Sequence, residues 1–157
     1  MASAALAKYA SSTEPLALST EGENVIFKLS VTLAADCKAV DQVVDGIMHM
    51  VRQMHCSAGK DDAIQVALSE ALANAVVHGA HADVRKKIEC EVSCDKTHGL
   101  LITVRDPGRG FDPASLPSPV TGENLYAQHG RGIYLINQLM DEVKFLKNGA
   151  EIRMLPR

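Results

Sequence analysis

The 157-residue sequence has no apolar run close to the roughly 20 residues that a membrane-spanning helix needs. It also has no excess of positive charge, because 16 lysines and arginines stand against 19 aspartates and glutamates, for a net charge of −3. We therefore expect no membrane insertion and no direct binding of nucleic acid. The hydrophobic and charged shares, 46% and 22%, are typical of a globular chain that forms one domain with its own core.

The cysteines lack the spacing of a metal site. No CxxC pair and no cluster of cysteine and histidine with zinc-finger spacing occurs, so we predict no structural zinc. Cys90 and Cys94 are four positions apart in an alternating segment, and this even spacing places both on one face of a sheet. We expect all four thiols, Cys37 and Cys56 included, to be reduced and structural.

The amino-terminal segment lacks the basic start and the continuous apolar stretch of a secretory signal. Residues 1–22 are instead rich in alanine and serine, and we predict a disordered tail there. The remaining residues, 23–157, are predicted to form one domain. Without an export signal, the expected location is the cytoplasm.

The first half of the domain predicts one strand and two helices. Residues 24–33 alternate between apolar and polar side chains, as a half-buried strand does. Asp36 then opens a segment with an apolar residue every three or four positions, which indicates an amphipathic helix. Asp61 or Asp62 can cap the next helix, and Gly79 is expected to end it.

The second half predicts two hairpins that flank a loop and a helix. Residues 86–95 and 99–106 form the first hairpin, and residues 142–157 form the second. Between them, the glycine- and proline-rich residues 107–132 form a long loop of the kind that acts as a lid, and residues 133–143 form a helix. The predicted fold class is α+β: a two-layer sandwich of a mixed β-sheet with helices on one face.

Glu70 and Asn74 lie one turn apart on a helix that is otherwise apolar, "ALSEALANAVVHG". Two interpretations stay open from these residues alone. The pair can sit at a solvated edge, as most polar residues do. Alternatively, it can line a cavity that holds Mg²⁺, because carboxylate and amide oxygens are hard ligands that suit this ion.

The second motif, "VRDPGRG", places a carboxylate at the end of an apolar strand, followed by glycines. Asp106 can accept a hydrogen bond from an adenine amino group, while Gly108 and Gly110 allow a nucleoside to approach the backbone. The competing interpretation is an ordinary Asp-Pro-Gly turn.

The third motif, "HGRGIYLINQLM", places Gly130 and Gly132 directly before a predicted helix. Free N–H groups at a helix start bind phosphate, and Arg131 and Arg109 can add positive charge. A glycine-rich helix start with no ligand is the alternative. The motif matches neither the P-loop nor the dinucleotide-binding pattern, so those classes are disfavoured.

Taken together, "SEALANAVVHG", "VRDPGRGF" and "HGRGIYLINQLMDEV" resemble, in this order, the N, G1 and G2 boxes of the GHKL ATPases, which have the Bergerat or histidine-kinase-like ATPase fold. Within that superfamily the chain is most similar to the bacterial anti-sigma factor serine kinases. The resemblance covers residues 24–157. It implies ATP and Mg²⁺ as cofactors, and a homodimer that phosphorylates a serine on a STAS-domain anti-anti-sigma partner and sequesters a sigma factor.

The resemblance also implies a role for each matching residue. Asn74 ligates Mg²⁺ and so contributes to ATP binding, Glu70 is the catalytic general base, and Asp106 recognises adenine. Backbone contacts to the nucleotide are implied for Gly108, Gly110, Gly130 and Gly132.

The sequence departs from the family pattern at two places. Some members carry an arginine that meets the γ-phosphate where this chain has Gln128, and Arg131 is our substitute candidate for ATP binding. Some members have threonine after the glycine of the last hairpin, where this chain has Ala150 and Glu151. His78 matches the family histidine, to which we assign a structural role at the helix end.

Three functional hypotheses follow. The first is an ATP-dependent serine kinase and anti-sigma factor. The second is a non-catalytic module of the same fold that binds ATP or a partner. The third, the catalytic half of a histidine kinase, is disfavoured, because His49 and His55 lie in the first helix of the domain itself rather than on a preceding dimerisation helix.

Overall fold

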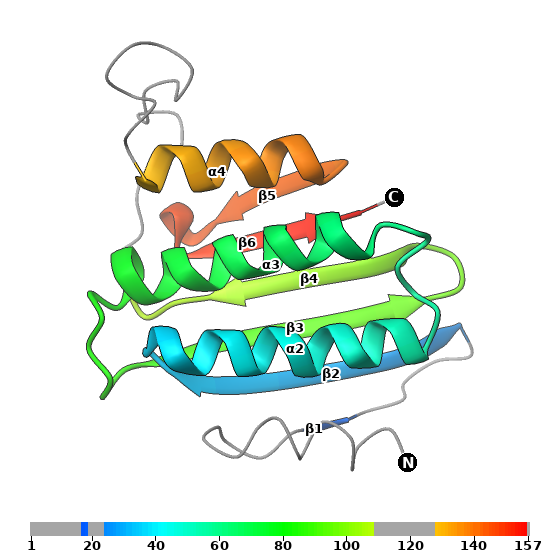
Figure 1. The fold of residues 1–157 in the computed structure, drawn as a ribbon, viewed down its shortest axis with the longest axis horizontal. Coiled ribbons are helices and arrows are strands. Elements are labelled where there is room, and N and C mark those ends of the chain that lie inside the picture. Colours follow the sequence, from blue (N-terminus) through cyan, green and yellow to red (C-terminus); the bar gives the residue numbers. More distant parts are fainter. Residues whose placement is uncertain (1–16, 19–23, 109–127, 157) are drawn as a thin grey trace.

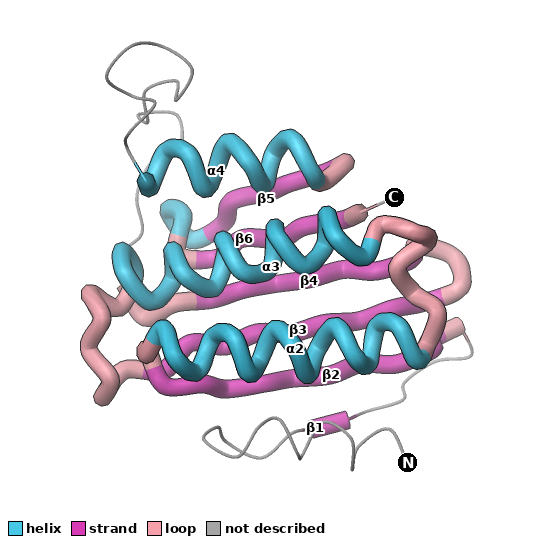
Figure 2. Tube along the Cα trace, viewed as in Figure 1, coloured by secondary structure: helices cyan, strands magenta, loops and turns pink. Residues whose placement is uncertain are grey.

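The computed structural model describes residues 17–18, 24–108 and 128–156. They form a sheet that carries three long helices on one face (Figures 1 and 2). The two-layer α+β architecture predicted from the sequence is confirmed, and so is the order of its elements. Of the predicted disordered tail, residues 1–22, only the two residues of the short strand β1 lie within the described part.

The six strands of the described residues belong to one sheet, in the order β1-β2-β3-β4-β6-β5. The prediction of a mixed sheet is wrong in this respect, because every strand pairing in the described residues is antiparallel. Two helices connect β2 to β3 and return the chain to the end where β2 stopped, so β3 runs back along β2. The bounds are β1 Ala17–Leu18, β2 Val25–Ala34, β3 Lys87–Asp95, β4 Gly99–Arg105, β5 Glu142–Leu146 and β6 Glu151–Leu155.

The helices begin close to the predicted positions, with two exceptions. Helix α2 (Cys37–Gln53) starts as expected, with the Asp36 carboxylate accepting a hydrogen bond from the Lys38 amide at 3.0 Å. Helix α3 (Asp61–Asn74) has Lys60 at its N-cap, so neither of the two aspartates predicted as caps occupies that position. They lie in its first turn, where their negative charge interacts favourably with the helix dipole and so stabilises the helix.

The second exception is α4 (Gln128–Leu139), which begins five residues before the predicted start. Gly130 and Gly132 therefore lie inside the helix rather than in front of it. Glycine lowers helix stability by about 1 kcal/mol relative to alanine, which is why the sequence favoured a loop here. Helix α4 packs against α3, and this tertiary contact is outside what local propensity takes into account.

The hydrophobic core lies between the sheet and the helices. Phe27, Leu29 and Leu33 of β2 are buried at every second position and face the helices, as the alternating pattern predicts. Helix α2 buries one side, including Ile47 and Met48, against them. The core is continuous from β2 to the last hairpin. Among the described residues, no helix is long and apolar enough to cross a bilayer.

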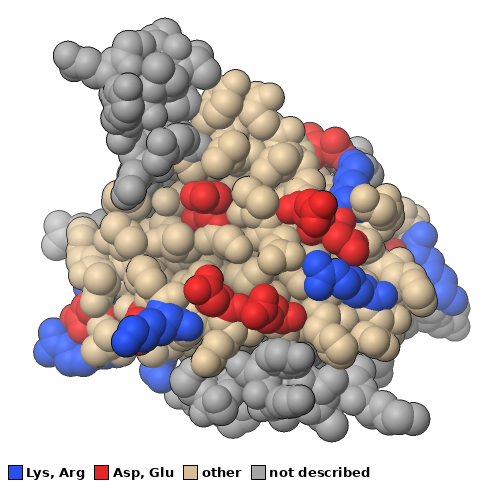
Figure 3. Space-filling view, viewed as in Figure 1, with Lys and Arg blue, Asp and Glu red and all other residues tan. Residues whose placement is uncertain are grey.

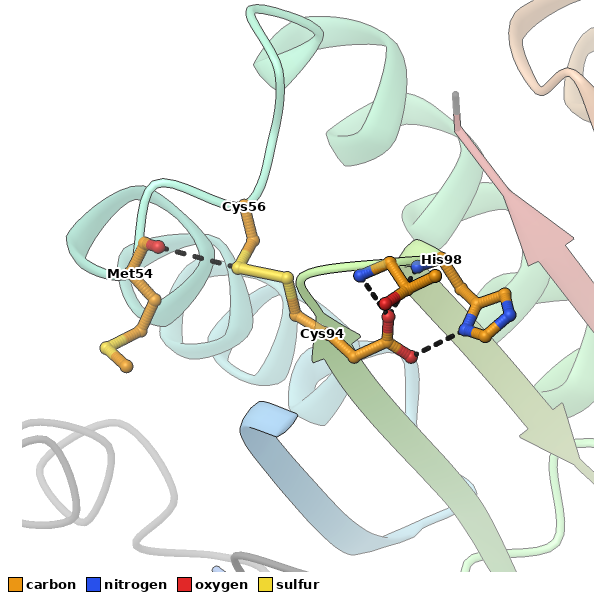
Figure 4. The surroundings of a disulfide bond; sticks show 6 residues. Met54, Cys56, Cys94 and His98 are labelled. Carbon is orange, nitrogen blue, oxygen red and sulfur yellow. Dashed lines mark hydrogen bonds and ion pairs between the residues drawn. A yellow bond between two sulfur atoms is a disulfide. The ribbon is translucent and has the colours of Figure 1, made fainter. Parts of the chain in front are cut away.

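Two cysteines form a disulfide bond that the sequence did not suggest. Cys56, on the connection after α2, is bonded to Cys94 near the end of β3 (Figure 4). The expectation of four reduced thiols is therefore wrong for this pair, although Cys90 and Cys94 do share the buried sheet face. A separation of 38 residues carries no local signal, so only the packing of the connection against the strand end brings the sulfurs together. Cys37 and Cys90 are free thiols.

Candidate functional site

Helix α3 places Glu70 and Asn74 toward α4. Its buried residues, among them Leu68 and Leu72, face the sheet, and the helix lies beside α4 (Figure 1). A Cβ atom built on Gly132 of α4 would lie 2.8 Å from Glu70 Oε2 and 3.2 Å from Asn74 Nδ2. Both polar side chains are therefore half-buried in the contact between the helices, and the interpretation of a freely solvated edge does not hold.

Asp106 lies directly after β4, at the end of the sheet where α3 ends. Its amide donates a hydrogen bond to the Ala150 carbonyl at 2.9 Å, which extends the pairing of β4 and β6 by one residue. Its carboxylate Oδ1 accepts a hydrogen bond from the Gly108 amide at 2.8 Å. Burial raises the pKa of Asp106, and the Gly108 hydrogen bond opposes that shift only in part. The Asp-Pro-Gly segment is thus a turn, and it also holds a half-buried carboxylate.

Two glycines make room for this carboxylate. A Cβ on Gly79 would lie 2.2 Å from Asp106 Cγ, a distance that no side chain can adopt. A Cβ on Gly108 would lie 2.5 Å from the Gly79 carbonyl oxygen and 2.8 Å from Asp106 Oδ1. The end of the helical segment that follows α3 and the turn after β4 are therefore in direct backbone contact at Gly79 and Gly108, and only glycine fits at either position.

A short π-helix, η1 (Ala75–Gly79), continues α3 toward this contact. Such segments are rare and occur often at functional sites. As predicted, Gly79 is the last helical residue. His78 lies in η1, and partial burial together with the nearby His81 lowers its pKa.

A cavity of about 510 Å³ lies between α3, α4 and the ends of β4 and β6. This volume is within the range of small-molecule sites, which are mostly apolar with a few directed polar groups. Asn74, Asp106 and Gly108 line it, so the structure brings together residues from the first two motifs. Its apolar wall consists of Ala71, Ala75, Val104, Ile133, Ile136, Phe145 and Ile152.

Sequence reasoning did not identify His81 and Lys86, which line the cavity from the loop after η1. Both are exposed polar residues in a loop, and nothing in their spacing separates them from ordinary surface residues. Ala150, which stands where some family members have threonine, lines the cavity.

Several predicted site residues lie wholly or partly outside the described residues. Gly110, Arg109 and most of the predicted lid, residues 107–132, fall outside the described residues. The side chain of Arg131 is also outside them, and so are those of Gln128 and His129. Within the described residues, no group of three or more histidine, cysteine, aspartate or glutamate side chains could hold a metal ion. A cation here would depend on a small number of protein ligands.

The helix-covered side has no continuous basic surface in the described residues. Figure 3 shows the lysines and arginines in separate groups near the edges, with acidic side chains between them. This distribution agrees with the balanced charge of the sequence. The described part of this side therefore offers no extended basic patch to which a polyanion could bind.

Comparisons with known proteins agree with the geometry. Residues 33–155 match the family model of the histidine kinase-like ATPase domain. A segment of 88 residues is 33% identical to an anti-sigma F factor of Oceanobacillus iheyensis, and covers 53% of this chain and 58% of that protein. The match therefore spans less than two thirds of this relative.

Proposed function

Because the chain belongs to the histidine kinase-like ATPase domain family, which implies ATP binding, we propose that it is an ATP-dependent serine protein kinase and anti-sigma factor. The observation that carries the proposal is that two polar groups, Asp106 and Asn74, line one cavity, with Glu70 one helical turn away from Asn74. Asp106 lies at one end, Asn74 lines the wall, and Glu70 lies one turn from Asn74 toward α4.

Asp106 is proposed to recognise the adenine base. Its carboxylate accepts a hydrogen bond from the 6-amino group, and the apolar wall with Val104 and Ile152 contacts the ring faces. Asp106 lines the cavity, and the absence of side chains on Gly79 and Gly108 leaves room for its carboxylate there. Gly110 is proposed to contact the nucleoside as well.

Asn74 is proposed to hold Mg²⁺ through its amide oxygen. This ion takes oxygen ligands, keeps several waters and binds phosphates, so a single protein ligand suits it. When bound, Mg²⁺ neutralises charge on the ATP phosphates. The first turn of α4, which includes Gly130, is proposed to donate backbone hydrogen bonds to the phosphates, with Arg131 as the added cation. Gly132 lies one step further into the helix, and it is proposed to let the nucleotide approach Glu70 and Asn74 closely.

Glu70 is proposed to act as the general base. It takes the proton from the hydroxyl of a substrate serine while the serine oxygen forms a bond to the γ-phosphorus. The bond between the γ-phosphorus and the bridging oxygen breaks, and ADP leaves. The half-buried position of the Glu70 carboxylate beside Gly132 supports this role, because the start of α4 is the proposed phosphate site.

The proposed partners are a STAS-domain anti-anti-sigma protein, which supplies the serine, and a sigma factor, which the chain sequesters. The name of the relative, an anti-sigma F factor, supports the sigma factor. We also propose a homodimer and a cytoplasmic location. Copurification from the native cell would identify the partner.

The test of the proposal uses labelled ATP, the full chain and a candidate STAS protein. Transfer of label to a serine supports the kinase, and Asn74→Ala is expected to abolish Mg-ATP binding or turnover. Nucleotide affinity equal to wild type in that variant would remove Asn74 from the metal site. Tight partner binding without transfer would favour the second candidate, a non-catalytic module, for which Gln128 in place of the family arginine is the supporting observation.

A further inference from the structure

A buried carboxylate lies on the face of the sheet that the helices do not cover. Glu151 is only 2% exposed, although it belongs to the last strand and has no helix above it. Isolated carboxylates in such positions are unfavourable, because they lose water without gaining a partner. The basic side chains that contact Glu151 therefore stabilise its carboxylate in this buried position.

Two of these contacts come from elements that form the cavity. Arg105, directly opposite Glu151 in the pairing of β4 and β6, donates a hydrogen bond from Nε to Glu151 Oε1. Lys147 Nζ lies 4.0 Å from the same oxygen and belongs to the turn η4 (Lys147–Gly149) between β5 and β6. We call Arg105, Lys147 and Glu151 the outer-face cluster. A third basic residue, Arg153, approaches the other carboxylate oxygen at 3.5 Å.

Each member of the cluster is within two residues of a group that lines the cavity from the opposite side of the sheet. Asp106 follows Arg105, Ala150 precedes Glu151, and Gly149 ends the turn that Lys147 begins. The Asp106 amide and the Ala150 carbonyl are hydrogen-bonded at 2.9 Å. A shift of β4 against β6 would therefore move the Asp106 carboxylate and the wall formed by Gly149 and Ala150 together.

We propose that the outer-face cluster positions the base-recognising end of the cavity, and so sets the preference for a nucleotide whose base carries a 6-amino group. This inference rests on the proposed function, because it assigns Asp106 to base recognition. Arg105, Lys147 and Glu151 are positioning residues, since they act on the far side of the sheet and touch no ligand. Charged groups suit this role because the Arg105–Glu151 hydrogen bond is directional, unlike an apolar contact.

The experiment compares two cluster variants with a matched control. Glu151→Gln keeps the shape and removes the charge, and Lys147→Gln changes an exposed side chain, so the second variant is expected to fold even if the first does not. Lys60→Gln is the control, because Lys60 forms an ion pair with Asp141 at 2.8 Å at the start of α3, outside the ion pairs that join Arg105 to Glu151 and Glu91. Each protein is titrated with ADP and with inosine diphosphate, which lacks the 6-amino group.

A second measurement needs no nucleotide. Amide hydrogen exchange is followed at Asp106 and Gly108, whose N–H groups bond to the Ala150 carbonyl and to Asp106 Oδ1. Loss of the cluster is expected to accelerate exchange at both amides. The wild type is expected to bind ADP more tightly than inosine diphosphate, and loss of the cluster should reduce this preference about tenfold. Removing a side chain that supports a binding group typically has an effect of that size. Lys60→Gln should change neither quantity.

The affinity ratio and the amide exchange together decide whether the outer-face cluster has a positioning role. An unchanged affinity ratio and unchanged exchange in both cluster variants, with only a lower unfolding temperature, would overturn the inference and leave the cluster a stabilising one. If the wild type binds neither nucleotide while exchange at Asp106 and Gly108 still responds, the proposed function fails and the positioning role stands. If neither binding nor exchange responds, both are wrong.

Discussion

At the scale of single residues, the site depends on side chains that are absent. Gly79, Gly108 and Gly132 come from three separate segments, and each leaves space that a polar group occupies. The carboxylates of Asp106 and Glu70 fill two of these spaces. Glycine is usually discussed for its backbone freedom, but here close approach between elements is the reason for its use.

We predict that Gly79→Ala lowers nucleotide affinity by about 100-fold and destabilises the fold by about 1–3 kcal/mol, since the added methyl overlaps the Asp106 carboxylate. Thermal unfolding and ADP titration measure the two effects. The double variant Gly79→Ala/Asp106→Ala removes the overlap, so its stability should return toward wild type while its ADP affinity stays low. A double variant as unstable as the single one would contradict this account.

Glu70→Ala is predicted to keep ATP binding and to lose phosphoryl transfer by a factor of about 10² or more, because a positioned base contributes on that scale. Single-turnover transfer from labelled ATP measures the rate. Asp62→Ala, an exposed acid in the first turn of the same helix, is the control and should retain the wild-type rate. Undiminished transfer in Glu70→Ala would assign the base to another residue.

At the scale of elements, α3 combines a structural side with a functional one. Its buried residues hold it on the sheet, while Glu70 and Asn74 face α4. The connection that leads into α3 is held at the opposite end of the sheet by the Cys56–Cys94 disulfide. An ion pair of 2.8 Å between Lys60 and Asp141 links the start of the same helix to the residues before β5.

Reduction of the Cys56–Cys94 disulfide is predicted to lower the free energy of unfolding by about 2–4 kcal/mol, as expected for a bond that closes a loop across 38 residues. Denaturant unfolding with and without a dithiol reductant measures the difference. Cys56→Ser should reproduce the effect, whereas Cys37→Ser, an exposed free thiol, should not. Four titratable thiols in the untreated, unfolded protein would show that the bond does not form.

At the scale of the whole molecule, the titratable groups make stability depend on pH in two steps. Partial burial and the neighbouring His81 lower the pKa of His78 from its ordinary value of about 6.5. Because the pKa of His78 is lower in the folded protein, the unfolded chain binds more protons once the pH falls below about 6.5. Its contribution to stability is thus complete above pH 6.5 and is lost as the pH falls through the lower, folded pKa.

A second loss is predicted in more acidic solution. Hydrogen bonds from Arg85 lower the pKa of Asp83 to about 2, and those from Lys28 and Arg105 lower the pKa of Glu91 despite the opposing effect of burial. These contributions are complete above the ordinary carboxylate pKa values of about 4 and disappear below them.

Thermal unfolding between pH 8 and pH 3 checks both steps. The midpoint is expected to fall first below about pH 6.5 and again below about pH 4. His78→Asn should remove the first step and leave the second. A midpoint that stays constant from pH 7.5 to pH 5 in the wild type would contradict the assignment to His78.

Local patterns in the sequence were sufficient for the succession of elements. Alternation predicts β2, β3 and β4, and the Asp36 cap predicts the start of α2, because each depends on neighbours only a few residues away. The motifs likewise supplied Asn74 and Asp106, both of which line the cavity, together with Glu70 beside Gly132.

Only the tertiary structure decided the remaining features. The insertion of β6 between β4 and β5, the early start of α4, the bond from Cys56 to Cys94 and the burial of Glu151 all depend on partners distant in the chain. Local patterns carry no record of such partners, because the free energy that favours each contact comes from packing that exists only after the chain has folded.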